Sequence, residues 1–336
     1  MMTNYYITSP GSIKRKDNTL LFEKNLTEVD GSNKTEKITI PVEGTRSLHL
    51  MGKNEIGTSC LAFLAKYGIP VYSYTRFNTL SGVWLPVPGG SIGANIVHQA
   101  LHYIDEQKRL FLAKAFIEGS IHQMARNIRK YNPTERQTVA FLQDAAVKLQ
   151  GARTVQNAMG FEGTARLAYY RAFFSTLTNG YSFHGRRKHP PPDPVNALIS
   201  FGNAMVYTLV TNEIVALGLS PAVSYLHEPG DRPVSLALDL ADIFKPLFVD
   251  VAVARALHDA DTPYEFATSA AAGSCLIKGA SKMRFAGEME DRFNTTVQHR
   301  AYSRNVSYRE LVRIECRKLL GHIKEETVYR PFKSWW

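Results

Sequence analysis

The feature that most constrains the fold of this chain is a change in its hydrophobic pattern near residue 90. Before it, short β-branched and aromatic runs alternate with turns rich in Gly, Pro, Asn and Asp, a pattern typical of strands. The runs are YYITS, TLLFE, KITIPV, SLHLMG, VYSYTRF and GVWLPV. After ProGlyGly at 88–90, apolar residues recur with helical spacing. The sequence therefore predicts an α+β protein, with an N-terminal β-sandwich-like domain over 1–90 and a larger all-α domain over 91–336.

Local signals predict individual elements within this frame. The residues KDN at 16–18 suit a hairpin turn, because Asp and Asn tolerate the backbone angles that such a turn requires. One helix is expected in the first domain, with Asn54 as its N-cap and Gly68 at its end. The expected helices of the second domain are one over 92–131, one after Pro133, one beginning near Phe161, one from Asp193 and Pro194 to Gly218, a short one from Ser220 and one from about Val234.

The charge balance favours a polyanionic partner. Forty Lys and Arg against thirty Asp and Glu give a net charge of +10, and phosphate neutralisation by such side chains drives nucleic-acid binding. A solvated basic surface is the alternative. The three cysteines are far apart and form no disulfide framework or CxxC pair. The opening residues carry no signal-peptide core and no apolar run approaches the roughly 20 residues of a membrane span, so we expect a cytoplasmic protein.

Two aspartates stand in the apolar segment LALDLADIFKP at 236–246. Asp239 and Asp242 are three residues apart, so on a helix they share one face. Their apolar neighbours indicate a buried helix, where an ionised carboxylate is costly unless it is paired or bound to a cation. The structural alternative is that one aspartate caps a turn and the other pairs with an arginine such as Arg232.

His227 precedes this segment by twelve residues, across a turn rich in Pro and Gly that folds the chain back. A lone histidine after an apolar stretch is commonly a satisfied core or surface group. Beside the two aspartates, however, its imidazole completes a ligand set suited to Mn²⁺ or Mg²⁺. The set lacks the cysteines or the HExxH helix of a zinc site.

Glu162 lies in MGFEGTARLAYYR, which we expect to place it in the first turn of a helix. A glutamate there complements the helix dipole, which is its structural alternative. Gly160 and Gly163 flank it and would permit close approach of a backbone or a ligand. Arg166 is expected one turn along the same face, placed to meet a phosphate or to pair with Glu162.

A resemblance to a known family joins these residues. FEGTARLAYY, PPDPVNALISFGNAM, LSPAVSYLH and LALDLADIFKP resemble the successive signatures of the CRISPR-associated spacer integrase, the adaptation nuclease of CRISPR systems. YYITSPGSIKRKDNTLLFE is similar to the opening of its β-domain, and YRPFKSWW to the tail of one branch of the family. The resemblance covers essentially the whole chain. Two positions depart from the family pattern: Ser224 and Tyr225 stand where a glycine-aromatic pair is usual, and Asn203 stands where a tyrosine often follows PheGly.

The resemblance implies a site and an activity. The family's metal ligands fall on Glu162, His227 and Asp242, with Asp239 as an acidic companion that helps to organise metal-bound water. It implies a metal-dependent DNA endonuclease and integrase that uses Mg²⁺ or Mn²⁺ and inserts short DNA fragments into a CRISPR array by 3′-hydroxyl attack. The alternatives are a general metal-dependent nuclease acting on branched DNA or RNA, and a non-catalytic nucleic-acid-binding scaffold.

Basic residues and partners complete the prediction. The proline-rich loop at 184–196 and the segment after residue 277 are rich in cations, and we expect DNA-backbone contacts, beyond Arg166, from Arg186, Arg187, Lys188, Lys278, Lys282 and Arg284. The expected DNA partners are short duplex fragments, branched DNA and the CRISPR repeat. The resemblance also implies a homodimer formed partly through the β-domains, and assembly with a small ferredoxin-like CRISPR adaptation protein.

Overall fold

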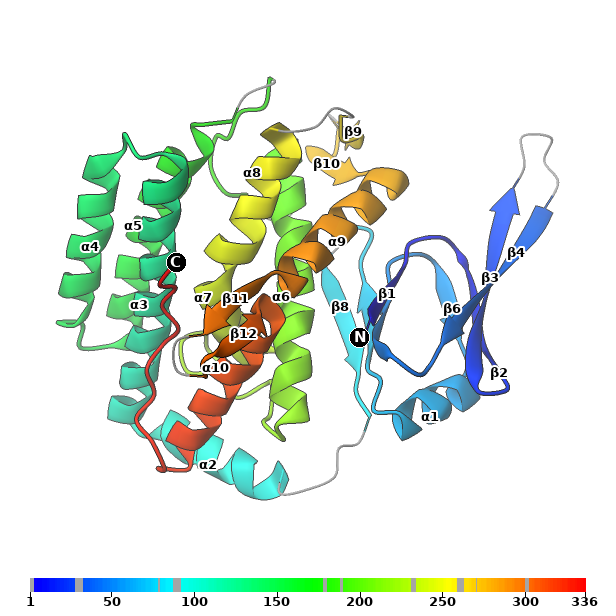
Figure 1. Ribbon diagram of the computed structural model, residues 1–336, viewed down its shortest axis with the longest axis horizontal. Coiled ribbons are helices and arrows are strands. Elements are labelled where there is room, and N and C mark those ends of the chain that lie inside the picture. Colours follow the sequence, from blue (N-terminus) through cyan, green and yellow to red (C-terminus); the bar gives the residue numbers. More distant parts are fainter. Residues whose placement is uncertain are drawn as a thin grey trace. The chain divides into compact units, whose positions relative to one another are not determined.

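The computed structural model describes residues 3–27, 33–77, 79–86, 92–177, 180–187, 190–230, 234–258, 263–269, 271–299 and 302–336 (Figure 1). Its contacts divide the chain into two compact units. The first comprises residues 1–88 with 278–286, and the second comprises 89–277 with 287–336. The segment 278–286 therefore groups with the N-terminal strands, which the sequence pattern gave no reason to expect.

The strands of the first unit form two four-stranded sheets. One has the order β1-β5-β7-β8 and the other the order β4-β3-β2-β6. The strands are β1 (Thr3–Ile7), β2 (Gly11–Lys16), β3 (Thr19–Thr27), β4 (Asn33–Pro41), β5 (Thr45–Leu50), β6 (Asn54–Ile56), β7 (Val71–Tyr74) and β8 (Leu80–Trp84). The hairpin between β2 and β3 turns at Asp17 and Asn18, and Asp17 has a φ of 51°. The turn predicted from KDN is confirmed.

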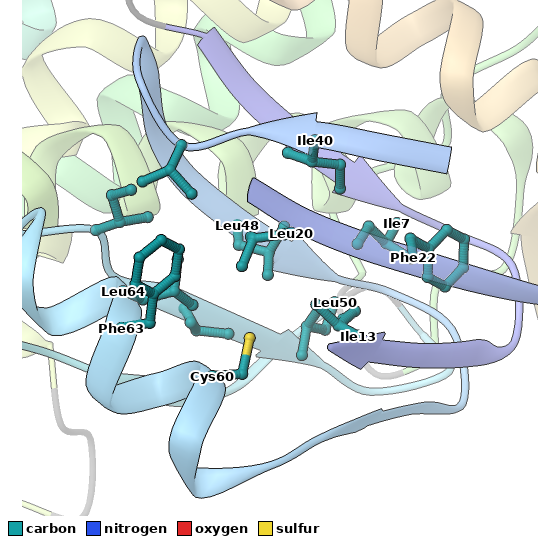
Figure 2. Close-up of a cluster of buried hydrophobic side chains, with 13 residues drawn as sticks. Ile7, Ile13, Leu20, Phe22, Ile40, Leu48, Leu50, Cys60, Phe63 and Leu64 are labelled. Carbon is teal, nitrogen blue, oxygen red and sulfur yellow. The ribbon is translucent and has the colours of Figure 1, made fainter. Parts of the chain in front are cut away.

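Both sheets contribute side chains to one apolar core (Figure 2). Leu48 and Leu50 come from β5, Leu20 and Phe22 from β3, and Phe63 from the helix that follows β6 in the chain. Burial of such side chains is worth about 1.5–3 kcal/mol each relative to exposure. This shared core explains why the N-terminal strands form one compact unit. That its sheets face one another as a sandwich stays a prediction.

The helix of this unit is shorter than the sequence suggested. Helix α1 (Thr58–Lys66) has Gly57 at its N-cap, and Gly68 follows its end with a φ of 65°. The predicted cap at Asn54 is wrong, because Asn54 belongs to β6 and its side chain bridges the carbonyl of Ser9 and the amide of Gly52. An asparagine side chain that is hydrogen-bonded to the backbone of a loop is not available to cap a helix.

The rest of the chain is mostly helical. Its helices are α2 (Ile92–Ile104), α3 (Glu106–Tyr131), α4 (Arg136–Leu149), α5 (Val155–Phe174), α6 (Pro194–Ala216), α7 (Ser235–Lys245), the π-helical turn η1 (Pro246–Asp250), α8 (Val251–His258), α9 (Gly279–Asn294) and α10 (Tyr308–Ile323). Two hairpins also occur, β9 (Phe266–Ser269) with β10 (Ser274–Ile277) and β11 (Thr296–His299) with β12 (Arg304–Ser307). The prediction of an all-α domain is therefore wrong in detail, because four-residue strands lie at the lower limit of length at which alternation indicates a strand.

Several helix ends differ from those predicted. The helical stretch over 92–131 is two helices, because Asp105 leaves helical geometry and accepts the amides of Gln107 and Lys108 as the cap of α3. No helix forms from Ser220 to His227, where the chain makes turns. Helix α6 begins as predicted, with Asp193 accepting the amide of Asn196. None of the described helices combines the length and hydropathy that a membrane span needs.

Candidate active site

The cavity lined by the predicted metal ligands lies within the mostly helical unit. It has a volume of about 620 Å³, and α5, α6, α7 and two loops contribute to its wall. The lining residues are Met159, Glu162, Gly163, Arg166, Leu167, Tyr170, Arg171, Phe183, His184, Gly185, Arg186, Asn203, Tyr207, His227, Leu238, Asp242 and Lys245. The three predicted metal ligands, Glu162, His227 and Asp242, are all among them, although they come from segments up to eighty residues apart.

Glu162 and Asp242 share an arginine. The Arg166 guanidinium donates to Glu162 Oε1 from Nε at 2.9 Å and from Nη2 at 2.6 Å, and Nη2 lies 3.4 Å from Asp242 Oδ1. The same nitrogen reaches Ser120 Oγ on α3 at 3.3 Å. Arg166 thus pairs with Glu162, as one of the two sequence predictions had it, and also joins α5 to α7.

The position of Glu162 in its helix corrects the sequence prediction. Helix α5 begins at Val155, where Thr154 caps it by accepting the amide of Asn157. Glu162 therefore lies about two turns inside the helix, beyond the reach of the N-terminal dipole. Gly160 was mistaken for a boundary. The helix tolerates it, and among the described residues an added Cβ at Gly160 or Gly163 would meet nothing within 4 Å, so no other described segment approaches the helix closely there.

A lysine also neutralises Asp242. Lys245, one turn further along α7, donates to Asp242 Oδ1 at 2.6 Å, and both side chains are about nine-tenths buried. The Lys245 ammonium lies over the Tyr207 ring, 4.7 Å from its centroid. Burial raises the pKa of Asp242, but the charges of Lys245 and Arg166 outweigh it and hold that pKa below its ordinary value. The Asp242 charge in turn holds the pKa of Lys245 above its ordinary value despite burial.

Asp239 lies behind the histidine and does not line the cavity. Its carboxylate is fully buried and accepts the backbone amides of Tyr225, Leu226 and His227 at 2.7, 2.9 and 3.0 Å. It also holds His227 Nδ1 at 2.8 Å. These contacts fix the turn and the imidazole, whereas the expected part of Asp239 in organising metal-bound water stays a prediction. A second partner of this kind sets which ring nitrogen is left to bind a ligand, here Nε2.

The protonation of His227 follows from this contact. Burial lowers the pKa of the imidazole, but the hydrogen bond to Asp239 and the charges of Asp242 and Asp239 raise it above its ordinary value of 6.5.

Both structural alternatives weighed for the aspartates also hold in part. Asp239 does cap a turn and Asp242 does pair with an arginine, which is Arg166, whereas Arg232 lies outside the described residues.

The donors of the site fit a hard divalent ion in their chemistry. Two carboxylates and one imidazole nitrogen suit Mg²⁺ or Mn²⁺, and all three groups line one cavity. They are not gathered into a preformed site, since across the described part of the chain no three His, Cys, Asp or Glu side chains are close enough to hold a metal ion. The reason is visible in the contacts, because the Arg166 guanidinium lies between Glu162 and Asp242.

The predicted DNA contacts divide into three groups. Arg186 lines the cavity, but its guanidinium donates to Asn196 Oδ1 and Ser200 Oγ, both at 2.9 Å, so it mainly ties the loop to α6. Arg187 is anchored through its backbone amide on Asn196. Lys188 lies outside the described residues. The last group, Lys278, Lys282 and Arg284, belongs to the other compact unit and is not part of this cavity.

Some residues of the site went unassigned in the sequence. Lys245 stands in the segment that drew attention to the aspartates, and its spacing of three residues from Asp242 was the available signal. Asn203 and Tyr207, one turn apart on α6, both line the cavity. Asn203 is buried, and its Oδ1 has no hydrogen-bond partner among the described residues. The alternation of apolar and small residues along α6 gave no sign of which face meets the cavity.

Comparison with known proteins identifies the family. A family model described as CRISPR associated protein Cas1 matches residues 5–291. A CRISPR-associated endonuclease Cas1 of Clostridium perfringens is 38% identical over 340 residues, covering 100% of both chains. The structure of a CAS1 protein from Thermotoga maritima, 28% identical, superposes with a TM-score of 0.81 over 98% of this chain and 100% of that one.

A casposase bound to its integration product shares the fold at 17% identity, with a TM-score of 0.86 over 99% of this chain and 94% of that chain. Fold and sequence thus define a CRISPR-associated protein. Within that class, the chain belongs to the Cas1 family.

Proposed function

We propose that this protein is a DNA endonuclease and integrase that inserts short DNA fragments into a CRISPR array. The observation that carries the proposal is the cavity in which Glu162, His227 and Asp242 come together with Arg166 and Lys245 in a member of the Cas1 family. Acidic and imidazole ligands beside cations are what a phosphodiester reaction needs, since the negative charge that develops on the phosphoryl oxygens must be stabilised.

In the proposed reaction a 3′-hydroxyl attacks a phosphodiester at the repeat boundary and the 3′-oxygen of the cut strand leaves. A Mg²⁺ or Mn²⁺ ion held by Glu162, His227 and Asp242 would polarise the phosphoryl oxygen. The protein's own groups bind and orient. Asp239 fixes the imidazole through Nδ1, and Arg171, exposed at the cavity wall, offers a cation to the incoming backbone.

The test is strand transfer of a labelled short duplex into repeat-bearing or branched DNA, with Mn²⁺ or Mg²⁺ and with EDTA. The natural protein is compared with His227→Ala and Asp242→Ala, and Asp144→Ala serves as the matched control. Asp144 is also a helical carboxylate paired with a lysine, Lys148 at 2.7 Å, but it is exposed on α4. We expect joining that needs the metal, is lost in the two site variants and persists in the control.

Two other outcomes separate the alternatives. Cutting without joining would leave a general metal-dependent nuclease that acts on branched DNA or RNA. DNA binding that EDTA does not affect, with no cutting or joining in any metal, would leave a non-catalytic scaffold.

We also propose that the active assembly is a homodimer that binds a small ferredoxin-like CRISPR adaptation protein. Adding that protein to the assay checks whether joining depends on it.

A further inference from the structure

The carboxylates proposed to hold the metal already have cationic partners of their own. The Lys245 ammonium lies 2.6 Å from Asp242 Oδ1, and the Arg166 guanidinium reaches Asp242 and Glu162 together. These side chains are between about four-fifths and nine-tenths buried, so the pairs are poorly screened by solvent. Around Asp242 and Glu162, two negative charges therefore face two positive ones.

We infer that Lys245 competes with the metal for Asp242. When a divalent ion binds, the Lys245 ammonium leaves Asp242 and pairs with a DNA phosphate. This inference rests on the proposed function, since it concerns the same ion and the same DNA. A cation that binds Asp242 must displace the ammonium from Oδ1 or share that oxygen with it. Either course is opposed by repulsion between like charges in a place from which water is largely excluded.

The surroundings of Lys245 make its release feasible. The side chain lines the cavity, and its ammonium also lies over the Tyr207 ring, so it keeps one partner when it leaves the carboxylate. A divalent ion alone would add two positive charges to a balanced cluster. A DNA phosphate entering the cavity supplies negative charge and accepts the released ammonium. Metal and DNA should therefore bind cooperatively, each strengthening the other by the same factor.

The experiment measures Mn²⁺ binding by calorimetry without any turnover. The proteins are the natural chain, Lys245→Met and the control Lys148→Met, which removes an exposed helical lysine that is also paired with an aspartate one turn before it. We expect Lys245→Met to bind Mn²⁺ on the order of tenfold more tightly than the natural protein, and Lys148→Met to bind as the natural protein does. Lys245→Gln, which keeps a hydrogen-bond donor without the charge, covers the case in which Lys245→Met unfolds.

The second arm repeats the titrations with a short duplex whose 3′ ends are dideoxy and cannot be joined. DNA should tighten Mn²⁺ binding by the natural protein on the order of tenfold, and by the Lys245 variants much less. The inference is overturned if the natural protein binds Mn²⁺ and the Lys245 variants bind it no more tightly. If the natural protein binds no Mn²⁺ even with DNA, the proposed metal site fails as well, so the two failures are distinguishable.

Discussion

At the scale of single residues, the site depends on groups that do not touch the cavity. Asp239 satisfies three backbone amides of one turn and the Nδ1 of His227 at once. Four donors converge on the two carboxylate oxygens, an arrangement that only a carboxylate can meet in full. The position of His227 is therefore fixed by a neighbour twelve residues away in the sequence.

Asp239→Asn tests this dependence. The amide presents one acceptor oxygen and an NH₂ group that faces donors, so we expect stability to fall by about 1–3 kcal/mol through buried unpaired groups. Loss of the contact that orients the imidazole should weaken Mn²⁺ binding by roughly 10–100-fold. Urea unfolding and Mn²⁺ calorimetry measure the two effects, with Asp144→Asn as the exposed control. Unchanged Mn²⁺ affinity in a folded Asp239→Asn protein would remove Asp239 from the site.

At the scale of elements, the helix that carries Asp242 and Lys245 continues through a π-helical turn into α8. Pro246 opens that turn, and its carbonyl accepts a hydrogen bond from Asn127 Nδ2 at 2.6 Å. Asn127 also donates to the Tyr169 hydroxyl at 2.8 Å, so one amide side chain joins this turn to α5. A proline lacks the amide of a regular helix, and this network fixes the irregular segment.

Asp250 gives this segment a pH dependence. Burial raises its pKa to about 7, against the opposing effects of Arg166, Tyr169, Lys245 and Arg186. The folded protein thus holds a proton that the unfolded chain releases near 3.8, so this contribution to stability is full below about pH 3.8 and falls as pH rises to about 7. Asp250→Asn should remove that slope and make the protein more stable than the natural one at about pH 8, by on the order of 1–3 kcal/mol.

Urea unfolding of both proteins at about pH 5 and about pH 8 checks the sign. The comparison is informative because asparagine retains the shape of the side chain and removes only its ability to ionise. An Asp250→Asn protein that is less stable than the natural one at the higher pH would show that the carboxylate is charged and needed there.

At the scale of the whole molecule, the net charge of +10 should make DNA binding strongly dependent on salt. Of the cavity cations, Arg171 is exposed, whereas Arg186 is bonded to Asn196 and Ser200. We expect Arg171→Gln to lower the slope of log K against log salt by about 1, the value for one lost phosphate contact. Binding isotherms at several salt concentrations measure the slope, with Lys148→Gln as the control. An unchanged slope would place the DNA backbone away from Arg171.

The sequence by itself determined the broad architecture and the identity of the acidic residues. Its strand runs and the turn at Asp17 and Asn18 depend on local preferences, which the chain carries without tertiary context. The cap at Asp193 is local in the same sense, since the side chain bonds its own helix. The family followed from motifs that keep their order along the chain and is confirmed, whereas the metal ligands inferred from the same motifs stay a prediction.

Tertiary structure decided what surrounds those residues. Arg166 pairs with Asp242, and Asp239 holds the His227 ring, because α5, α7 and the turn at 225–227 meet in space. No periodicity reports such a meeting, since ion pairs between segments depend on packing and not on sequence spacing. The helix around Glu162 was misjudged for a related reason. Packing of its apolar face stabilised a helix through two glycines, against their local preference.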